Sequence, residues 1–520
     1  MTTARVHSQP GHHLLDGTVR VMLAEALFPV TGLVTAAFLT RSLGPDGYGL
    51  LTLAVTLIGL VEWSINSFFS RATIKHVGES TDWRPIGTVA IQLQFRMGVW
   101  AMAAMWMLAL PFARLLNEPS LVAYLALMAM NIPIFALAQA HRHVLAGTGA
   151  YRECAVASAG RWIARLVFVI ILVAGGLSVF GVILAIIGST LLELRLYRRS
   201  LRPALFSRIG LTSWALWDYS WPLFLSAMCL AAVGRIDLFA VKALGATAEE
   251  AGLYGAAQNL ALLPALLSMS AAPLLLSSVS RALSSGDSNL AKTMTRQAMR
   301  GVLPLFPLAA MVAGSADEIA VCLFGESFQG TGRFLSSLIF GTAATLPLSV
   351  VLTVLIADGH PRMTFVLTGL LVPLALLGHV VVIPRYGPFG ASLVTTSVEF
   401  IGMVIGLVTL GRLWGVTPPL GTVVRTLVVS LIVLTVALTW PTPGLLVFVK
   451  LCVLTGLVIA CYWAFQEFTG EEIALARSLV MRKRTAMPST NETEGVSEAD
   501  PIKHEDSGSA RTVRGKAATP

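Results

Sequence analysis

The stretch Thr40-Arg41-Ser42-Leu43-Gly44-Pro45-Asp46-Gly47-Tyr48-Gly49-Leu50-Leu51 lies between two apolar runs and consists largely of residues that favour turns. Each flanking run, 18–39 and 48–70, is long enough to cross a hydrocarbon core of about 30 Å as an α-helix. Proline and glycine end one helix and allow the next to begin within a few residues. The stretch therefore predicts a tight turn between two membrane-spanning helices.

The composition of the whole chain agrees with this interpretation. Its 520 residues are 55% hydrophobic and only 12% charged, and the mean hydropathy is +0.75. Apolar segments of about 20 residues, the length of a transmembrane helix, recur from near Gly17 to near Gln466. These values indicate an all-α, polytopic membrane protein with little chain left for a soluble domain.

The apolar pattern predicts about fourteen transmembrane helices. Their approximate ranges are 18–39, 48–70, 86–112, 120–141, 155–175, 178–197, 215–242, 252–280, 301–324, 333–357, 363–383, 388–410, 421–440 and 443–466. The first seventeen residues are polar, and the apolar run after them is too long for the core of a signal peptide, so we expect it to remain as the first helix. The segment 467–520 is polar and charged, which predicts a disordered tail.

Lysine and arginine are concentrated in alternate loops. If the amino terminus is cytoplasmic, most of them lie in cytoplasmic loops, including the basic linker 201–213. This bias predicts a multi-pass protein of the cytoplasmic membrane with both termini inside. The formal charge of +9 does not indicate a nucleic-acid partner, because the basic residues are spread between apolar segments rather than gathered in one patch. We expect Lys450, near the start of the last helix, to extend its amine to the membrane surface.

The sequence predicts neither a cofactor nor an enzyme. The five cysteines are widely scattered and form neither a disulfide framework nor a metal-ligand spacing. Every predicted external loop is short, whereas a polytopic glycosyltransferase or polymerase needs a large external loop that carries carboxylates or a catalytic base. The chemistry of this chain is therefore expected to be binding and transport.

A degenerate copy of the opening stretch occurs at 242–257, with the sequence KALGATAEEAGLYGAA. Both copies contain a basic residue, Leu-Gly, a turn and a Gly-Tyr-Gly or Gly-x-Tyr-Gly motif before an apolar helix. Each follows the first helix of a set of six, which predicts two parallel repeats related by an axis along the membrane normal. The alternative is that any short external turn favours these residues. The residues that the repeat singles out are Gly44, Gly47, Tyr48, Gly49, Gly245, Gly252, Tyr254 and Gly255.

The repeat divides the chain into six parts. A cytoplasmic amino-terminal segment (1–17) precedes an N-lobe of six helices (18–200). The basic linker (201–213) leads to a C-lobe of six helices (214–410), which is followed by two further helices (411–466) and the tail (467–520).

Four stretches resemble the prokaryotic oligosaccharide flippases, the Wzx-like polysaccharide-transport branch of the multidrug/oligosaccharidyl-lipid/polysaccharide exporter superfamily. They read AAFLTRSLGPDGYGLLTLAVTLIGL, LGATAEEAGLYGAAQNLALLPALLSMSAAPLLLSSVSR, CLFGESFQGTGRFLSSL and IPRYGPFGASLVTTSVEF. The resemblance extends from about Gly17 to Leu410. The family often has Asp-x-Gly near the inner end of helix two, whereas this chain reads EWSINSFFSR at 62–71.

The resemblance implies a transporter that turns a lipid-linked oligosaccharide, usually carried on a polyprenyl diphosphate, across the cytoplasmic membrane by alternating access. Two six-helix lobes would rock about a central cavity, and the paired turn motifs would be outer hinges or gates. The alternative for these residues is that they form plain tight turns. The implied partners are the lipid-linked oligosaccharide and the bilayer, and the resemblance leaves contact with polysaccharide polymerase or export machinery open.

Arginines inside the predicted helices are the first candidates for cargo binding. Arg165 and Arg96 lie deep in their helices, and a mid-bilayer arginine costs about 2.5–3.5 kcal/mol on insertion scales, so both are expected to face a wet cavity or a partner. Arg161 shares a helix face with Arg165, and together they would suit phosphate oxygens. One alternative is structural ion pairing, for which Glu25 and Glu62 are the candidate carboxylates. Another is that the side chain, above all that of Arg161, extends to the membrane surface.

The second half of the chain contains further polar candidates. Arg235 and Asp237 are two residues apart and do not face each other on a helix, so each needs a separate partner. Arg235 is also close enough to the outer surface to extend to it. Asp218 and Glu399 complete the charged set, and four amides can bond either sugars or neighbouring helices, namely Asn66, Gln139, Gln258 and Asn259.

Two other transport functions remain open. A drug or cation antiporter of the same superfamily would have twelve helices, and the two extra helices after Gly411 and the Wzx-like motifs argue against it. A flippase of peptidoglycan lipid precursors would share the fourteen helices, and the motifs fit the polysaccharide branch better.

Overall fold

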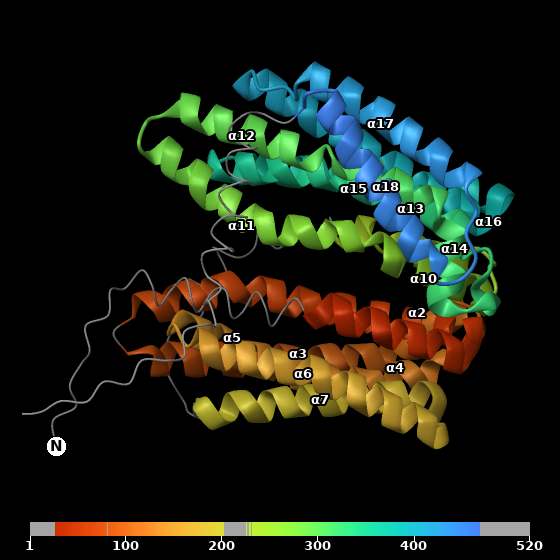
Figure 1. The fold of residues 1–520 in the computed structure, drawn as a ribbon. Helices are drawn as coiled ribbons and strands as arrows, with labels where there is room; N and C mark the ends of the chain where they lie inside the picture. The colour runs from red at the N-terminus through yellow and green to blue at the C-terminus, as the bar shows by residue number, and fades with distance from the viewer. Residues whose placement is uncertain (1–26, 81, 202–224, 226–227, 230, 468–520) are drawn as a thin grey trace, which may run out of the picture. The chain divides into compact units, whose positions relative to one another are not determined.

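The computed structural model describes residues 27–80, 82–201, 225, 228–229 and 231–467. The described residues form helices joined by short turns, with no strand among them (Figure 1). The predicted segment 1–17, most of the basic linker 201–213 and nearly all of the tail lie outside these residues. Two of the candidate carboxylates, Glu25 and Asp218, also lie outside them.

The first half of the chain forms a bundle in which α2 contacts every other main helix. The elements are α2 (Leu27–Glu79), α3 (Trp83–Leu115), α4 (Leu121–Ala129), α5 (Asn131–Gly147), α6 (Tyr151–Leu172), η1 (Val173–Leu177) and α7 (Ser178–Ser200). We call this bundle the N-lobe, as in the sequence analysis. Every main helix of the N-lobe buries apolar side chains, because its apolar face packs against the neighbouring helices.

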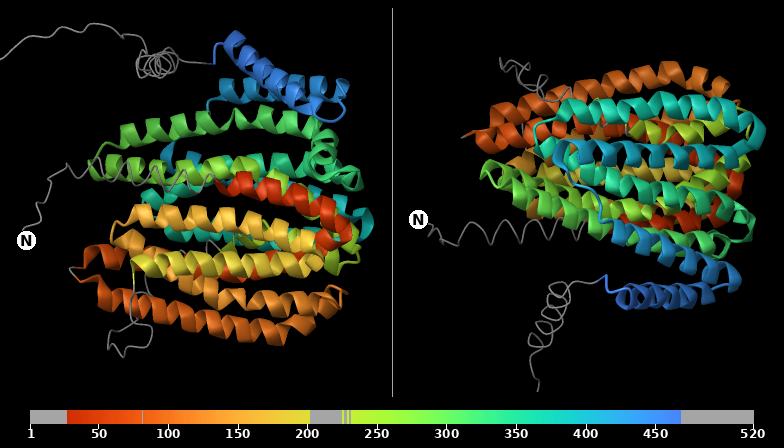
Figure 2. Two further views of the ribbon diagram at one scale, coloured as in Figure 1. Left: turned by 60° about the horizontal axis from the view of Figure 1, so that its bottom comes forward. Right: turned by 90° about the horizontal axis from the view of Figure 1, so that it is seen from above.

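The second half begins, within the described residues, with short helices and continues with long ones. The elements are α9 (Ile236–Ala243), α10 (Ala248–Ala261), α11 (Leu263–Ser284), α12 (Ser288–Val302), α13 (Leu305–Gly314), α14 (Ala316–Phe324), η2 (Glu326–Phe328), α15 (Thr331–Ala357), α16 (Pro361–Trp414), α17 (Leu420–Thr439) and α18 (Leu446–Ala464). We call α9 to α16 the C-lobe. The views in Figure 2 show α17 and α18 running beside each other, and α13 packs against both.

Glycines with positive φ divide three of the long helical segments. Gly44 in α2 has a φ of 67°, Gly176 in η1 a φ of 89° and Gly387 in α16 a φ of 59°. An α-helix of 53 residues would be about 80 Å long, more than twice the hydrocarbon thickness, so each kinked segment is long enough for two crossings. The turn predicted at 44–47 is thus a sharp kink, after which Pro45 begins the next helix with its φ already suited to it.

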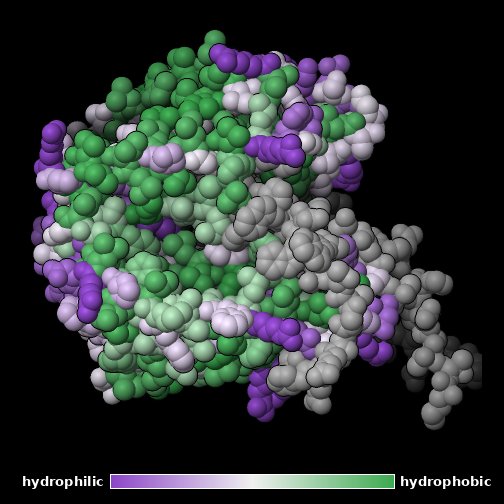
Figure 3. All heavy atoms as spheres, turned by 180° about the vertical axis from the view of Figure 1, so that it is seen from behind, coloured by the Kyte–Doolittle hydropathy of each residue, from purple (hydrophilic) through white to green (hydrophobic). Residues whose placement is uncertain are grey.

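Nine helices in the described part of the chain are long and apolar enough to span a membrane. Three of them, Leu27–Ser70, Tyr151–Ser200 and Arg362–Trp414, contain the kinks. In Figure 3 apolar side chains cover the middle of one face, and hydrophilic side chains gather toward its ends. The chain is therefore an all-helical polytopic membrane protein, and the number fourteen stays a prediction.

One helix lies between two predicted spans. The residues between 252–280 and 301–324 form mainly the end of α11 and the helix α12, and a turn at 303–304 separates α12 from α13. Asp287 caps α12 by accepting a hydrogen bond from the backbone N–H of Leu290. Ala291, Thr295 and Met299 recur at four-residue spacing and are buried. Charged residues on the opposite face interrupt the apolar run, so the length of apolar segments does not predict this helix.

An ion pair joins α18 to α14. Lys450 is fully buried, and its Nζ lies 2.6 Å from Oε2 of Glu318. The same carboxylate accepts hydrogen bonds from the backbone N–H and the hydroxyl of Thr442. The expectation that Lys450 extends to the membrane surface was therefore wrong, because a carboxylate lies within reach inside the protein.

Lys450→Met is expected to lower the stability of the purified protein. It removes the cation from a largely buried carboxylate, and breaking such a pair costs roughly 3–5 kcal/mol. The measurement is thermal unfolding in detergent followed by size-exclusion chromatography. Adding Glu318→Gln should recover part of the loss, because no charge is then left uncompensated, and Arg412→Met at an exposed position is the control. An unfolding temperature equal to that of the unchanged protein would contradict a structural role for the pair.

Candidate functional site

The two arginines on one face of α6 have different environments. Nε of Arg161 lies 3.4 Å from Oε2 of Glu193, and its guanidinium stacks 4.2 Å from the centroid of the Trp162 ring. Glu193 is fully buried and also accepts a hydrogen bond from Tyr197. Within the described residues, the carboxylate that directly contacts Arg161 is that of Glu193 on α7. Of the two carboxylates predicted to flank the arginines, Glu62 is described below and Glu25 lies outside the described residues.

Glu193 was missed because of its position in the sequence. It is followed by Arg195, Arg198 and Arg199, so it looked like part of a solvated helix end. The sequence feature that could have identified Glu193 is its position as a carboxylate within the last apolar turns of a predicted span.

Arg165 lies one turn further along α6 and is partly buried. Its nearest charged neighbours are Arg161 and Glu62. The Glu62 carboxylate accepts a hydrogen bond of 2.8 Å from Nδ2 of Asn131, and it lies within electrostatic range of both arginines. Within the described part of the chain, the Arg165 guanidinium has no hydrogen-bond or ion-pair partner. The structure thus brings Arg165, Arg161 and Glu62 together.

The other N-lobe candidates are not part of this cluster. Arg96 is exposed on α3, next to the exposed side chains of Phe95 and Val99. Gln139 is buried in α5, and the Oδ1 atom of Asn66 in α2 is buried without a hydrogen-bond partner in the described chain. None of these three residues has a contact that assigns it a role.

In the C-lobe, Asp237 is the centre of a hydrogen-bond network. It is fully buried, and its Oδ2 accepts hydrogen bonds from the hydroxyls of Tyr254 (2.7 Å) and Thr395 (3.0 Å). Its Oδ1 accepts from Nε2 of Gln258 (2.7 Å) and from the backbone N–H of Leu238 (2.8 Å). Four donors compensate this carboxylate, and Arg235 does not take part, in agreement with the expectation of separate partners. Thr395 was not among the site residues predicted from the sequence.

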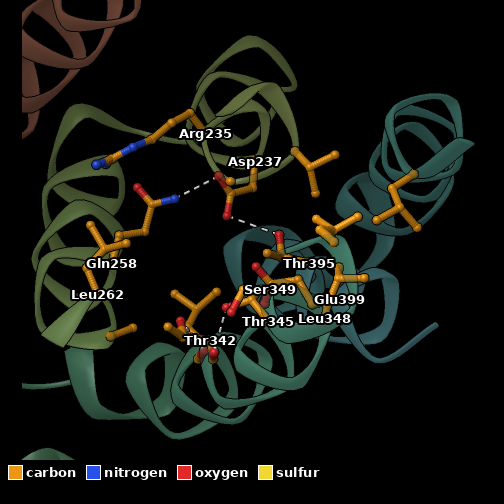
Figure 4. A pocket seen from close by; sticks show the side chains of 16 residues that line it. Arg235, Asp237, Gln258, Leu262, Thr342, Thr345, Leu348, Ser349, Thr395 and Glu399 are labelled. Atoms are coloured by element: carbon orange, nitrogen blue, oxygen red, sulfur yellow. Dashed lines mark hydrogen bonds between the residues drawn. The ribbon is translucent and has the colours of Figure 1, made fainter. Parts of the chain in front are cut away.

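A cavity of about 270 Å³ lies beside this network. Figure 4 shows its walls, with Arg235 and Asp237 from one side, Gln258 from α10, Glu399 from α16 and a row of hydroxyls from α15. The chain turns at Gly234 and Arg235 before α9 begins at Ile236, so the continuous helix predicted over 215–242 is interrupted here. The turn places the Arg235 side chain on the cavity wall.

The two copies of the repeated motif contact each other directly. A Cβ added to Gly49 would meet the carbonyl oxygen of Ala248, and a Cβ added to Gly252 would meet the carbonyl oxygen of Pro45. A Cβ at Gly255 would lie 2.7 Å from Cγ2 of Thr52. The absence of side chains at these glycines is what permits α2 and α10 to approach backbone to backbone.

Polar contacts flank the glycine interface. Nδ2 of Asn259 donates a hydrogen bond of 2.9 Å to the Tyr48 hydroxyl, so Asn259 joins two helices here. Tyr48 also makes an edge contact with the ring of Phe328. Tyr254, the matching tyrosine of the second copy, is instead buried inside the C-lobe and bonds Asp237. Gly44 and Gly245 have positive φ and make turns, and Gly47 lies under the Leu43 side chain.

The basic residue of each copy reaches into the other lobe. Nη2 of Arg41, in the N-lobe, donates a hydrogen bond of 2.9 Å to the carbonyl oxygen of Cys322 at the end of α14. Nζ of Lys242, in the C-lobe, lies 2.7 Å from Oε1 of Glu118, which follows α3. The two contacts are reciprocal, because each joins the first helix of one repeat to the end of the third helix of the other.

Comparisons with known proteins identify the family and the fold. A family model described as "Polysaccharide biosynthesis protein" matches residues 38–333. None of the curated proteins matches the chain. A structure of the lipid II flippase MurJ in an inward closed conformation superposes with a TM-score of 0.67 at 13% identity, over 90% of this chain and 100% of that one.

Two other similar structures are transporters of the MOP superfamily. One, from Pyrococcus furiosus, has a TM-score of 0.60 at 14% identity over 80% of this chain and 99% of that one. The other, a multidrug resistance MATE family transporter in an outward-facing conformation, has a TM-score of 0.59 at 13% identity over 79% of this chain and 97% of that one. At these sequence identities the similarity shows a shared fold.

Asp237→Ala is expected to destabilise the C-lobe. It leaves the buried donors of Tyr254, Gln258 and Thr395 without their acceptor, at about 1–3 kcal/mol each. The measurement is the thermal unfolding temperature in detergent, and Asp46→Ala at an exposed position is the control. If both variants unfold at the same temperature, Asp237 does not organise this region.

Proposed function

Since the chain belongs to the polysaccharide biosynthesis protein family, we propose that it moves a lipid-linked oligosaccharide, carried on a polyprenyl diphosphate, across the cytoplasmic membrane for the synthesis of a surface polysaccharide. It is a membrane transporter with the fold of the MOP superfamily and not an enzyme. The proposed mechanism is alternating access, in which the cavity opens first to the cytoplasm and then to the outside. The proposal places both termini in the cytoplasm.

The environment of Arg165 carries this proposal. A guanidinium in a membrane-spanning helix needs a counter-charge or water, and its neighbour Arg161 is already paired with Glu193. Glu62 balances only part of the combined charge of the two arginines. The diphosphate of the cargo supplies the missing negative charge and several acceptor oxygens, which a planar guanidinium binds in a bidentate manner.

The contacts between the repeats support alternating access. In this arrangement the lobes are held together at the end that carries both motifs, by the glycine interface and by the reciprocal contacts of Arg41 and Lys242. We propose that this end is the outer gate and that the structure has it closed. Besides the backbone contacts, the interface contains three polar contacts, those of Arg41, of Lys242 and of Asn259 with Tyr48, whose groups can bond water when the lobes separate.

The antiporter and the peptidoglycan-precursor flippase are alternatives that the fold does not separate from this proposal. An antiporter would leave lipid-linked sugars unchanged when the chain is deleted. A peptidoglycan-precursor flippase would lead to the accumulation of peptidoglycan precursor. Mass spectrometry of the lipid-linked sugars that accumulate in a deletion strain therefore decides between the three functions.

Arg165→Ala is expected to reduce export strongly while leaving most of the protein folded, because it removes a cation that has no direct partner in the described chain. Arg165→Lys should restore export only in part, since lysine keeps the charge and loses the planar fork. The measurement is polysaccharide export per amount of folded protein in the membrane.

Arg161→Ala is the matched control on the same helix face. It strands the buried carboxylate of Glu193, so its main effect should be a loss of folded protein. Normal export per folded molecule in Arg165→Ala would rule out the cargo-binding role of Arg165.

Gly252→Ala is expected to open the proposed outer gate. Its Cβ meets the carbonyl oxygen of Pro45, so the two backbones must separate. The measurement is labelling of Thr52→Cys, in a variant without other cysteines, by a maleimide that does not cross the membrane. Labelling from outside should rise about tenfold, the effect of a shift of about 1.4 kcal/mol in the gate equilibrium. Gly59→Ala is the control, because no atom lies within 4 Å of its added Cβ. Unchanged labelling in Gly252→Ala would exclude this contact as the gate.

A further inference from the structure

We propose that the C-lobe cavity beside Asp237 is a carbohydrate subsite, which receives sugar units of the lipid-linked cargo through their hydroxyl groups. This inference rests on the proposed function and assigns the sugar part of the cargo to a place separate from Arg165. The cavity is defined by the residues that line it, among them Arg235, Gln258, Thr345 and Glu399.

A row of hydroxyls on α15 forms one wall. Thr342, Thr345 and Ser349 all line the cavity, and their spacing of three and four places them on one face of the helix. Each hydroxyl donates its hydrogen to a backbone carbonyl of its own helix, at 3.1, 2.7 and 2.7 Å. The hydroxyl oxygens of Thr342 and Thr345 keep their lone pairs, so they can accept hydrogen bonds from a ligand.

Gln258 adds an acceptor whose orientation is set by its neighbour. Its Nε2 donates to Asp237, which fixes the direction of the amide. Its Oε1 is buried and has no hydrogen-bond partner in the described chain, although the residue is only 6% exposed. A buried amide oxygen without a partner on the lining of a cavity indicates a site for a donor from outside the protein.

Glu399 provides a further acceptor. It lines the cavity from α16, and no described residue donates a hydrogen bond to its carboxylate. A Cβ added to Gly341 would collide with this carboxylate, so the glycine in α15 is what allows Glu399 to lie against the row of hydroxyls. Gly341 is thus a positioning residue for the carboxylate.

The ligand must bring many donors and at least one acceptor. The walls provide the hydroxyl oxygens, the Gln258 amide oxygen and the Glu399 carboxylate as acceptors, and the Arg235 guanidinium as a donor on another wall (Figure 4). Sugar hydroxyls both donate and accept, and neighbouring hydroxyls can share one carboxylate. The excess of acceptors over donors matches a sugar better than a diphosphate, whose oxygens can only accept hydrogen bonds.

The size of the cavity separates a sugar from a bare cation. A water needs about 10–15 Å³ of the same measure of volume, so a cavity of about 270 Å³ has room for many waters. A bare cation would occupy only a small part of this space, whereas one sugar unit would fill much of it. A sugar replaces several waters at once and makes contacts with more than one wall.

The test compares two ligands that differ only in the sugar. The full-length protein in lipid nanodiscs is titrated with the lipid-linked oligosaccharide extracted from a strain that lacks this chain, and with undecaprenyl diphosphate, which has no sugar. Glu399→Gln and Thr345→Val are each expected to weaken binding of the oligosaccharide lipid by about tenfold, the effect of one lost hydrogen bond to a charged or well-oriented group. Neither should change binding of undecaprenyl diphosphate.

The control variant is Thr353→Val, which changes a hydroxyl on the same helix that does not line the cavity. It should bind both ligands like the unchanged protein. Gly341→Ala, which displaces the Glu399 carboxylate without removing it, should reproduce the effect of Glu399→Gln. The folded state of every variant is checked by its thermal unfolding temperature before titration.

The outcomes separate this inference from the proposed function. If Glu399→Gln and Thr345→Val weaken both ligands equally, or weaken neither, the cavity is not a carbohydrate subsite. If sodium chloride, compared with choline chloride, stabilises the protein through Glu399 and the sugar makes no difference to binding, the site takes a cation and the inference is wrong. If Arg165→Ala leaves binding of undecaprenyl diphosphate intact, the diphosphate role of Arg165 fails, whatever the cavity variants show.

Discussion

The high cost of placing an uncompensated polar group in hydrocarbon governs this structure. Every backbone N–H and C=O in a membrane-spanning segment must find a partner, which is why the described chain is helical throughout. The same cost explains why the buried charges are held in pairs or networks. Glu193 meets Arg161, Glu318 meets Lys450, and Asp237 is surrounded by four donors. Arg165 and Glu399 stand out against this background, because no described residue pairs with either of them.

The two copies of the repeated motif form the contacts that hold the lobes together. Apolar helices gain little from hydrophobic association inside a membrane, so close backbone packing and polar contacts must hold the lobes together. The glycines of both motif copies provide the close packing, and Arg41 and Lys242 provide the polar contacts. The symmetry is not exact. Tyr48 joins the lobes by bonding Asn259, whereas Tyr254 supports Asp237 inside one lobe.

The two lobes offer different chemistry to an amphipathic cargo. The N-lobe cluster around Arg165 and Arg161 is cationic, and Glu62 compensates it only in part. The C-lobe cavity offers mainly acceptors, together with one guanidinium at Arg235. One lipid-linked molecule contains both a diphosphate, which needs cationic donors, and a sugar chain, which needs mainly acceptors. The proposed function assigns the diphosphate to the N-lobe, and the further inference assigns the sugar to the C-lobe.

The sequence by itself determined the helical membrane class, the turn at Gly44 and the presence of two related halves, because the length of apolar runs, helix-breaking residues and a repeated motif are local properties of the chain. It also identified most of the residues that come together, including Arg161, Arg165, Asp237 and Gln258. Only the tertiary structure decided their partners. The pairing of Arg161 with Glu193 and of Lys450 with Glu318, the location of Thr395 under Asp237, and the contact of Gly49 with α10 join residues far apart in the chain. Which side chains meet depends on how the helices pack, and the period of an apolar pattern shows which face of a helix is buried but not which helix covers it.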